Sequence, residues 1–208
     1  AVQNGMRLYY YSRADYKNKL HIFSEEYIKE NFGNVYAVPE GGTNKLALKG
    51  VEELLEEINI DYDFICTACG TGGTVSGLVS GLKGNKKVIG VPVLKGGKFI
   101  EDEITKLVSA KTNKQFNNYK ILTDYHLGGY AKINFDLVKF IYEFKATNNI
   151  QLDPIYTGKL LFAINDLLSK NYFPPNTNIV ALHTGGIQGL AGMQKKMNKI
   201  YNNHYNKI

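Results

Sequence analysis

The sequence predicts an α/β fold in which a mostly parallel, twisted sheet is flanked by helices. Short apolar runs alternate with amphipathic stretches of roughly 10–15 residues, a pattern typical of strand–helix–strand units. Polar or glycine-rich segments follow the expected strands at 40–44, 70–74 and 184–186. Because ligands bind beyond the carboxyl ends of parallel strands, we expect the functional site at these loops.

The first forty residues are predicted to contain two strands and one helix. The aromatic and apolar runs at 5–11 and 35–38 favour strands, and Pro39 ends the second of them. Between them, residues 24–31 carry a helical pattern. Ser24 is the expected N-cap of this helix, and the glutamates that follow it suit the first turn.

Beyond a loop at 41–44, helices and strands alternate to the end of the chain. The segment 46–58 is predicted to be an amphipathic helix, because its aliphatic residues recur at helical spacing. Further strands are predicted at 62–67, 86–93, 119–122 and 178–183. Further helices are predicted from the glycine loop to residue 82 and at 99–108, 135–147, 157–169 and 189–202.

Composition describes a globular protein with a packed core. Hydrophobic residues make up 44% of the chain, yet no apolar run reaches the roughly 20 residues that span a membrane. No charged-then-apolar leader opens the sequence, so we expect a cytoplasmic protein with no membrane partner. The net charge is +6, but the lysines are spread along the chain, which argues against a nucleic-acid partner.

Two cysteines, Cys66 and Cys69, form a C-x-x-C pair. A zinc site would need a second ligand pair nearby, and a redox pair would need a helix N-terminus that lowers the thiol pKa. Cys66 instead lies within an apolar strand and Cys69 at the entrance of the following loop. We therefore expect buried structural cysteines, a reducing compartment and no metal site.

The loop at 70–74 is the most informative segment of the sequence. Gly70, Thr71, Gly72, Gly73 and Thr74 lie between an apolar strand and a helix. Glycines leave backbone N–H groups uncovered, threonines add hydroxyl donors, and the helix directs its positive end at the loop, so we expect phosphate binding. The P-loop and the dinucleotide fingerprint are excluded, because their Lys-Ser/Thr ending and third glycine are absent. A tight turn without a ligand is the alternative.

Five motifs occur in an order that resembles a known family. They are Pro39-Glu40-Gly41-Gly42-Thr43-Asn44, the loop at 69–77, Gly128-Gly129-Tyr130, the segment Leu-Asp-Pro-Ile-Tyr-Thr-Gly-Lys at 152–159, and His183-Thr184-Gly185-Gly186. They resemble the pyridoxal-phosphate enzymes of the 1-aminocyclopropane-1-carboxylate deaminase and D-cysteine desulfhydrase family, whose fold is that of tryptophan synthase β. The resemblance implies pyridoxal 5′-phosphate as cofactor, a small amino acid as substrate, and a possible homodimer.

The resemblance also implies a domain division and a missing segment. Residues 1–38 match the end of the family's small domain, and 39–208 its large cofactor-binding domain. The family's Schiff-base lysine, in a Gly-Asn-Lys-x-Arg-Lys motif, belongs to an upstream segment that these 208 residues do not include. Lys45 does not replace it, because the Arg-Lys continuation is absent, and we expect Lys45 at the surface. The chain alone is therefore expected to be inactive.

The resemblance assigns roles to the remaining residues. The 70–74 loop would hold the cofactor phosphate, while Tyr130 and Tyr156 would line the substrate site as catalytic residues. Tyrosine can act as an acid or base when its pKa is lowered. Thr184 would lie beside the pyridine nitrogen; a threonine that merely caps the strand end is the alternative.

Two cofactor-site positions distinguish the family's activities. The cyclopropane-opening deaminases have Tyr-Glu-Gly-Lys and His-Leu-Gly-Gly, whereas this chain has Thr157 and Thr184 at the second position of each motif. Both differences favour D-cysteine desulfhydrase, which releases sulfide, pyruvate and ammonia. The deaminase itself, a non-catalytic phosphate-binding or cofactor-binding module, and one half of a split enzyme completed by an N-terminal fragment remain the alternatives.

Overall fold

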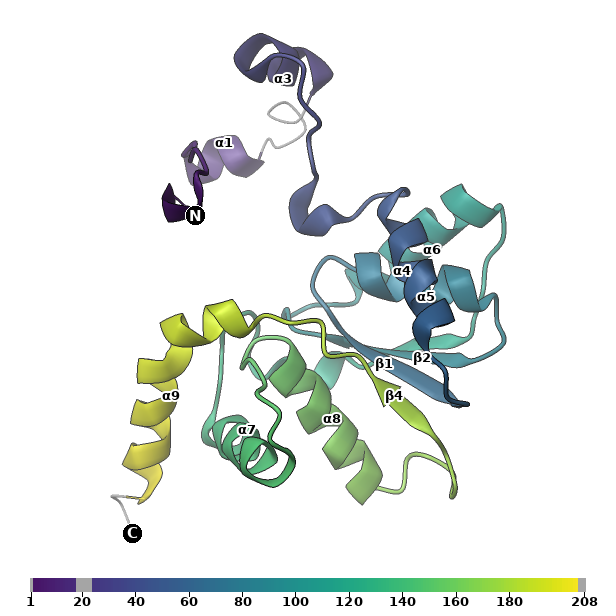
Figure 1. Cartoon of the computed structure of the whole chain (residues 1–208), viewed down its shortest axis with the longest axis vertical. Helices are drawn as coiled ribbons and strands as arrows, with labels where there is room; N and C mark the ends of the chain where they lie inside the picture. Colours follow the sequence, from purple (N-terminus) through teal and green to yellow (C-terminus); the bar gives the residue numbers. More distant parts are fainter. Residues whose placement is uncertain (1, 18–23, 206–208) are drawn as a thin grey trace. The chain divides into compact units, whose positions relative to one another are not determined.

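The computed structural model describes residues 2–17 and 24–205, and the chain divides into two compact units, Ala1–Glu40 and Gly41–Ile208 (Figure 1). The first unit contains a 3₁₀ turn at Val2–Asn4 and the helices α1 (Arg13–Lys17) and α3 (Glu25–Phe32). The predicted helix and its cap are confirmed, because Ser24 Oγ accepts a hydrogen bond from the Tyr27 N–H at 3.2 Å. The assignment of residues 1–38 to the remnant of a small domain stays a prediction.

The two strands predicted in the first unit are wrong. Residues 5–11 and 35–38 belong to no sheet, and their side chains are largely exposed, including Tyr10 at 87% and Tyr36 at 68%. A strand requires a neighbour that accepts and donates its backbone hydrogen bonds, and the described part of the chain supplies none here. Aromatic and β-branched composition alone therefore misled the prediction.

The second unit is built on a parallel sheet of four strands, which confirms the predicted fold class. The strands are β1 (Phe64–Cys69), β2 (Lys87–Pro92), β3 (Tyr119–Ile121) and β4 (Ile179–Ala181), in the order β3-β2-β1-β4. Every pair among them is parallel, and Cys66 of β1 is opposite both Ile89 and Ala181. All four strands therefore end at the same edge of the sheet.

Helices cover both faces of this sheet (Figure 1). On one face, Ile65 and Cys69 of β1 pack against α4 (Ala47–Glu57), α5 (Gly73–Leu82) and α6 (Phe99–Thr112). On the other face, Phe64, Cys66 and Ala68 pack against α8 (Thr157–Ser169). All six residues of β1 are buried, as expected for a parallel strand covered on both sides.

Two further helices complete the second unit. Helices α7 (Phe135–Asn148) and α9 (Leu190–Tyr205) enclose a third apolar cluster around the fully buried Met197. Short 3₁₀ turns lie at Glu40–Gly42, Thr123–His126 and Ile187–Gly189. The helices predicted in the second unit are all confirmed, within four residues at each end.

The two cysteines are buried and free, as expected. Cys66 is 0% and Cys69 2% exposed, and neither forms a disulfide. Burial in the apolar interior raises the pKa of both thiols to about 12. Neither sulfur is therefore a thiolate near neutral pH, which fits a structural role.

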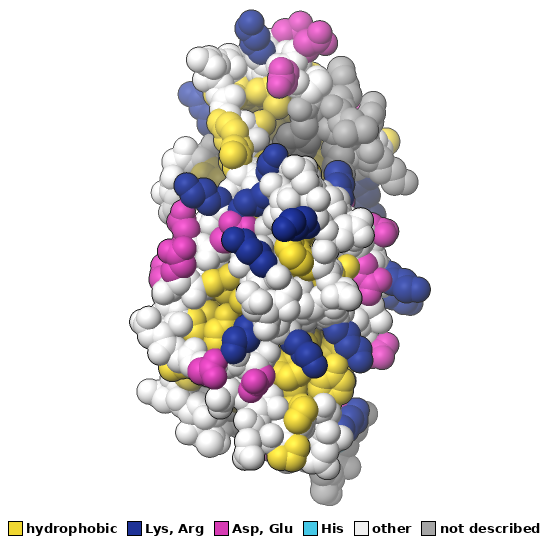
Figure 2. All heavy atoms as spheres, turned by 90° about the vertical axis from the view of Figure 1, so that its right-hand side faces the viewer, with side chains coloured by type: hydrophobic (Ala, Val, Ile, Leu, Met, Phe, Trp, Pro, Cys, Tyr) yellow, Lys and Arg dark blue, Asp and Glu magenta, His cyan; other side chains and the backbone are white. Residues whose placement is uncertain are grey.

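The described surface shows mixed charge. In Figure 2, basic and acidic side chains are interspersed over the visible face, between smaller apolar areas. Among the described residues, no helix combines the length and the apolar character needed to cross a lipid bilayer. The predicted absence of a nucleic-acid partner stays a prediction.

One partly buried ion pair ties together the three helices on the first face. Glu52 of α4 accepts hydrogen bonds from Lys111 of α6 and from Ser80 of α5. Burial acts to raise the pKa of Glu52, but these two hydrogen bonds and the Lys111 charge outweigh it and hold the pKa below its usual range.

Replacing Glu52 with Gln should therefore lower the free energy of unfolding by about 1–2 kcal/mol at pH 7. The pKa of Glu52 is lower in the folded than in the unfolded chain, so this stabilisation is complete above the unfolded pKa and is lost as the pH falls through the folded value. Urea unfolding of both chains between pH 3 and 7 measures the difference. Glu53→Gln, at an exposed position of the same helix, is the control and should change the free energy of unfolding little.

Candidate cofactor site

The loop at 70–74 joins the end of β1 to the start of α5, as the sequence predicts. Gly72 is the N-cap of α5 with φ +96°, and no side chain caps the helix there. The N–H groups of Gly73, Thr74 and Val75 belong to the first turn and have no acceptor within the helix. An uncapped helix start with free backbone donors is suited to an anion such as a phosphate.

A second loop lies against this one and contributes a hydroxyl. Thr43 Oγ1 and Thr71 Oγ1 form a hydrogen bond. A Cβ added to Gly73 would lie 2.8 Å from Thr43 Oγ1, and one added to Gly41 would overlap the Thr71 side chain. Only glycine permits the two loops to approach this closely.

Thr43 is a candidate residue that sequence reasoning missed. It belongs to one of the five motifs that resemble the family, but the sequence predicts no role for it. Lys45 is exposed and lies two residues before α4, in agreement with the predicted surface position. No local pattern predicts that Thr43 contacts Thr71, because that contact depends on how the loops before α4 and α5 pack.

Tyr130 and Tyr156 lie together. Their ring centroids are 6.1 Å apart, with the rings inclined at 73°. Tyr156 immediately precedes α8, and its ring would be 3.5 Å from a Cβ added to Gly70. Tyr130 comes from the loop after β3 and is 53% exposed. The aromatic pair is therefore adjacent to the 70–74 loop.

The pKa of Tyr156 is raised, not lowered. Burial is the main cause, and the neighbouring Tyr130 and the negative charge of Asp153 add to it, so that the pKa reaches about 12. Tyr156 accordingly keeps its phenolic proton near neutral pH. A phenol with a raised pKa is a weak acid, so Tyr156 is suited to donate a hydrogen bond rather than to transfer a proton.

Thr157 is fully buried and its hydroxyl is bound to Asp153. Thr157 Oγ1 donates to Asp153 Oδ2 at 2.7 Å and accepts from the Asp153 N–H at 3.0 Å. The Asp153 carboxylate, 2% exposed, also accepts the N–H groups of Ile155, Tyr156 and Thr157 at 2.8 Å each. Asp153 thus stabilises the start of α8, and direct contact between Thr157 and the cofactor stays a prediction.

Thr184 is exposed in the loop that follows β4. Two contacts place this loop beside the turn before α8. His183 Nε2 lies 2.8 Å from the Gln151 carbonyl oxygen, and a Cβ added to Gly186 would lie 3.1 Å from Asp153 Oδ2. The proposed pyridine-nitrogen contact of Thr184 stays a prediction.

The residues fit the phosphate group of pyridoxal phosphate. The 70–74 loop offers backbone donors, two threonine hydroxyls and a helix N-terminus, while Thr43 adds a third hydroxyl. The loops after β1, β3 and β4 all leave the same edge of the sheet. Among the described residues, no group of three or more His, Cys, Asp or Glu could hold a metal ion.

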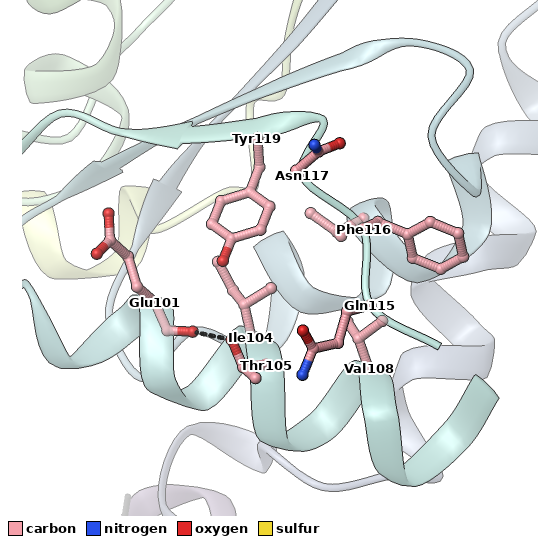
Figure 3. A pocket seen from close by; sticks show the side chains of 9 residues that line it. Glu101, Ile104, Thr105, Val108, Gln115, Phe116, Asn117 and Tyr119 are labelled. Atoms are coloured by element: carbon pink, nitrogen blue, oxygen red, sulfur yellow. Dashed lines mark hydrogen bonds between the residues drawn. The ribbon is translucent and has the colours of Figure 1, made fainter. Parts of the chain in front are cut away.

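A separate pocket lies outside this site. It has a volume of about 420 Å³ and lies between α6 and the segment 115–119 that leads into β3 (Figure 3). Ile104, Val108 and Tyr119 point into it from the two sides. None of the predicted site residues lines this pocket, so it plays no part in the cofactor site.

A parallel sheet with a glycine-rich loop at its carboxyl edge defines the class of fold, and comparison with known proteins defines the family. The sequence pattern of the family described as "Pyridoxal-phosphate dependent enzyme" matches residues 4–185. The chain belongs to this family, whose members use pyridoxal phosphate.

Two relatives carry the name "Putative 1-aminocyclopropane-1-carboxylate deaminase". The Thermotoga maritima protein is 29% identical over 178 residues, covering 78% of this chain and 55% of that protein. The Pyrococcus horikoshii protein is 30% identical over 176 residues, covering 79% of this chain and 53% of that protein. The chain thus spans about half the length of these curated relatives.

A solved structure supports the fold assignment. The crystal structure of a protein described as an ACC deaminase homologue superimposes with a TM-score of 0.75 at 26% sequence identity. The match covers 93% of this chain and 62% of that chain. The predicted fold type and the predicted family are both confirmed.

The phosphate assignment can be tested with inorganic phosphate and with pyridoxal phosphate. Either ligand at 100 times its dissociation constant should stabilise the fold by about 2.7 kcal/mol. Thr71→Val should raise that constant about tenfold, because a hydrogen bond to a charged group is lost. Isothermal titration and thermal unfolding measure both effects. Thr105→Val, at an exposed position of α6, is the control and should leave the dissociation constant unchanged. A Thr71→Val chain that binds as tightly as the control would mean that the ligand binds elsewhere.

Proposed function

We propose that this chain forms the large part of a pyridoxal-phosphate lyase that eliminates sulfide from D-cysteine. The family membership supports the cofactor, and the packing of Tyr156 against the 70–74 loop is the observation that carries the proposal. This packing brings a protonated phenol next to the predicted phosphate site. Thr157 and Thr184, where the cyclopropane-opening enzymes have Glu and Leu, support the desulfhydrase reaction.

In the proposed reaction, D-cysteine loses its Cα proton to a base of the completed enzyme. The electron pair of that bond forms a carbon–carbon double bond as the C–S bond breaks and sulfur departs with its own electron pair. When bound, pyridoxal phosphate supplies the electron-accepting ring. Tyr156, whose raised pKa keeps its phenol protonated near neutral pH, donates a hydrogen bond to the departing sulfur. The remaining three-carbon fragment takes up water and yields pyruvate and ammonia.

The other site residues bind the cofactor or orient the groups around it. Gly70 to Thr74 bind the phosphate through N–H and hydroxyl donors, and Tyr130 orients the Tyr156 hydroxyl from the neighbouring loop. Thr184 offers the ring nitrogen a neutral hydroxyl, which does not favour a positive charge there as a carboxylate would. Thr157 acts on the site indirectly: its hydroxyl is bound to the Asp153 carboxylate and helps to fix that carboxylate in position.

Deaminase activity on 1-aminocyclopropane-1-carboxylate is the second candidate, and the names of the relatives favour it. The cyclopropane has no leaving group, so opening the ring requires stronger electron withdrawal than sulfide elimination does. A protonated ring nitrogen supplies that withdrawal, and an acidic partner supports it better than a threonine does.

The 208-residue chain alone should bind pyridoxal phosphate without attaching it covalently. The sequence contains no Gly-Asn-Lys-x-Arg-Lys motif, and Lys45 is exposed at the start of α4. Borohydride treatment followed by dialysis and peptide mapping should therefore find no cofactor on the chain and no turnover. Cofactor fixed to Lys45 or Lys49 would overturn the lysine assignment, while reversible binding without turnover also fits a non-catalytic module.

Specificity can be tested in an enzyme completed with a family N-terminal segment. Such an enzyme should release pyruvate from D-cysteine and little 2-oxobutyrate from the cyclopropane substrate. Thr184→Leu should lower the release of pyruvate from D-cysteine several-fold relative to the release of 2-oxobutyrate from the cyclopropane substrate. Thr157→Glu is a poor companion variant, because it would place a second carboxylate beside the buried Asp153. If the unmutated enzyme prefers the cyclopropane, the deaminase assignment is correct.

A further inference from the structure

Lys159, two residues into the first turn of α8, is a fully buried lysine. Its Nζ donates to the carbonyl oxygens of His126 and Gly129 at 2.7 Å each, and to that of Val93 at 3.5 Å. An ammonium group has three donors and no acceptor, so these three carbonyls match its hydrogen-bonding capacity. The acceptors come from two loops, one after β2 and one after β3.

The charge of Lys159 is balanced in an unusual way. Buried lysines are normally paired with a carboxylate, yet no carboxylate lies within ion-pair distance of Nζ in the part of the chain that the structure describes. Burial lowers the pKa of Lys159 to about 8. The charge of Asp153 opposes part of this shift, and the charge of Lys196 adds to it. The amine therefore remains mostly protonated at neutral pH, with carbonyl dipoles as its direct partners.

The loop that supplies two of these carbonyls is conformationally strained. Leu127, Gly128, Gly129 and Ala131 have φ values of +51°, +97°, +115° and +54°. Leucine and alanine rarely adopt this region, so surrounding contacts must hold the loop in place. Gly129 supplies one of the Lys159 acceptors and is covalently joined to Tyr130. Lys159 in turn follows Tyr156 by one helical turn.

We propose that the carbonyl groups of Val93, His126 and Gly129 form a cation site, which the Lys159 ammonium fills as a built-in occupant. Lys159 is thereby a positioning residue that holds Tyr130 beside Tyr156. The functional meaning of the tyrosine pair rests on the proposed function. The cation site itself does not, because it needs neither cofactor nor substrate.

A truncated side chain should turn this site into one for a small ammonium ion. Lys159→Ala removes three methylene groups and the ammonium, which together correspond to n-propylammonium. The variant should unfold at a lower temperature, and propylammonium chloride should restore stability in a saturable manner. 1-Propanol has the same chain length without the charge and should restore little. Equal rescue by both would show that Lys159 acts by packing alone and would overturn the proposal.

Lys196 provides a matched control on the same loop. Its Nζ donates to the Ala131 carbonyl oxygen at 2.9 Å from an exposed position on α9. Lys196→Ala removes a lysine–carbonyl hydrogen bond without opening a buried site, so it should lose little stability and gain nothing from propylammonium. Rescue of both variants alike would indicate a general salt effect and count against the proposal.

The positioning role has a readout that needs no enzyme activity. In chains labelled with ¹³Cζ-tyrosine, Tyr130→Phe should lower the apparent pKa of Tyr156, because Tyr130 helps to raise it. This effect of Tyr130→Phe on the pKa of Tyr156 should disappear in a Lys159→Ala background and return when propylammonium is added. It should persist in a Lys196→Ala background. Unchanged coupling in Lys159→Ala, or in the volume-preserving Lys159→Met, would refute the positioning role.

A measurement on the unmutated chain covers the case in which the variants do not fold. The Lys159 ammonium protons should give a ¹H–¹⁵N signal protected from solvent exchange, with through-hydrogen-bond correlations to the carbonyl carbons of His126 and Gly129. A rapidly exchanging Lys159 ammonium would overturn the proposal. Failure of pyridoxal phosphate to bind would leave all these measurements unaffected, so the two hypotheses can fail separately.

Discussion

The burial of β1 on both faces is the constraint on which the rest of the second unit depends. Helices α4, α5 and α6 cover one face and α8 covers the other, while β2 and β4 take up its two hydrogen-bonding edges. A strand enclosed in this way has no freedom in register, because a shift of one residue would exchange its two packed faces. The loop that follows Cys69 is therefore fixed at one edge of the sheet, where the loops after β3 and β4 also emerge.

The segment 152–159 shows how buried charge can organise such an edge. Asp153 accepts the N–H groups at the start of α8, whereas Lys159 donates to carbonyl groups of two other loops. Each charge is balanced by backbone dipoles of the opposite polarity rather than by a direct partner charge. Tyr156 lies between these two anchors, so its position is determined from both sides of the helix start.

Much of the second unit could be predicted from the sequence because its signals are local. Amphipathic spacing identified α4, and the change from an apolar run to glycines identified the junction of β1 and α5. The same reasoning failed at 5–11 and 35–38, because strand composition cannot reveal whether a neighbouring strand exists. The Thr43–Thr71 contact, the raised pKa of Tyr156 and the carbonyl partners of Lys159 also depend on residues distant in sequence. No pattern in a single segment encodes them.

The position of β4 beside β1 has a consequence for how the chain is made. The hydrogen bond from the Asn178 N–H to Asp63 Oδ2, at the entry to the two strands, joins residues 115 positions apart. Strand β2 lies much closer in the chain and can pair with β1 while synthesis continues, but the other edge of β1 stays unpaired until β4 leaves the ribosome. Long-range parallel pairing of this kind forms slowly. During that interval the nascent chain presents an apolar strand edge to other strands, and chaperones that shield such edges would favour its correct folding.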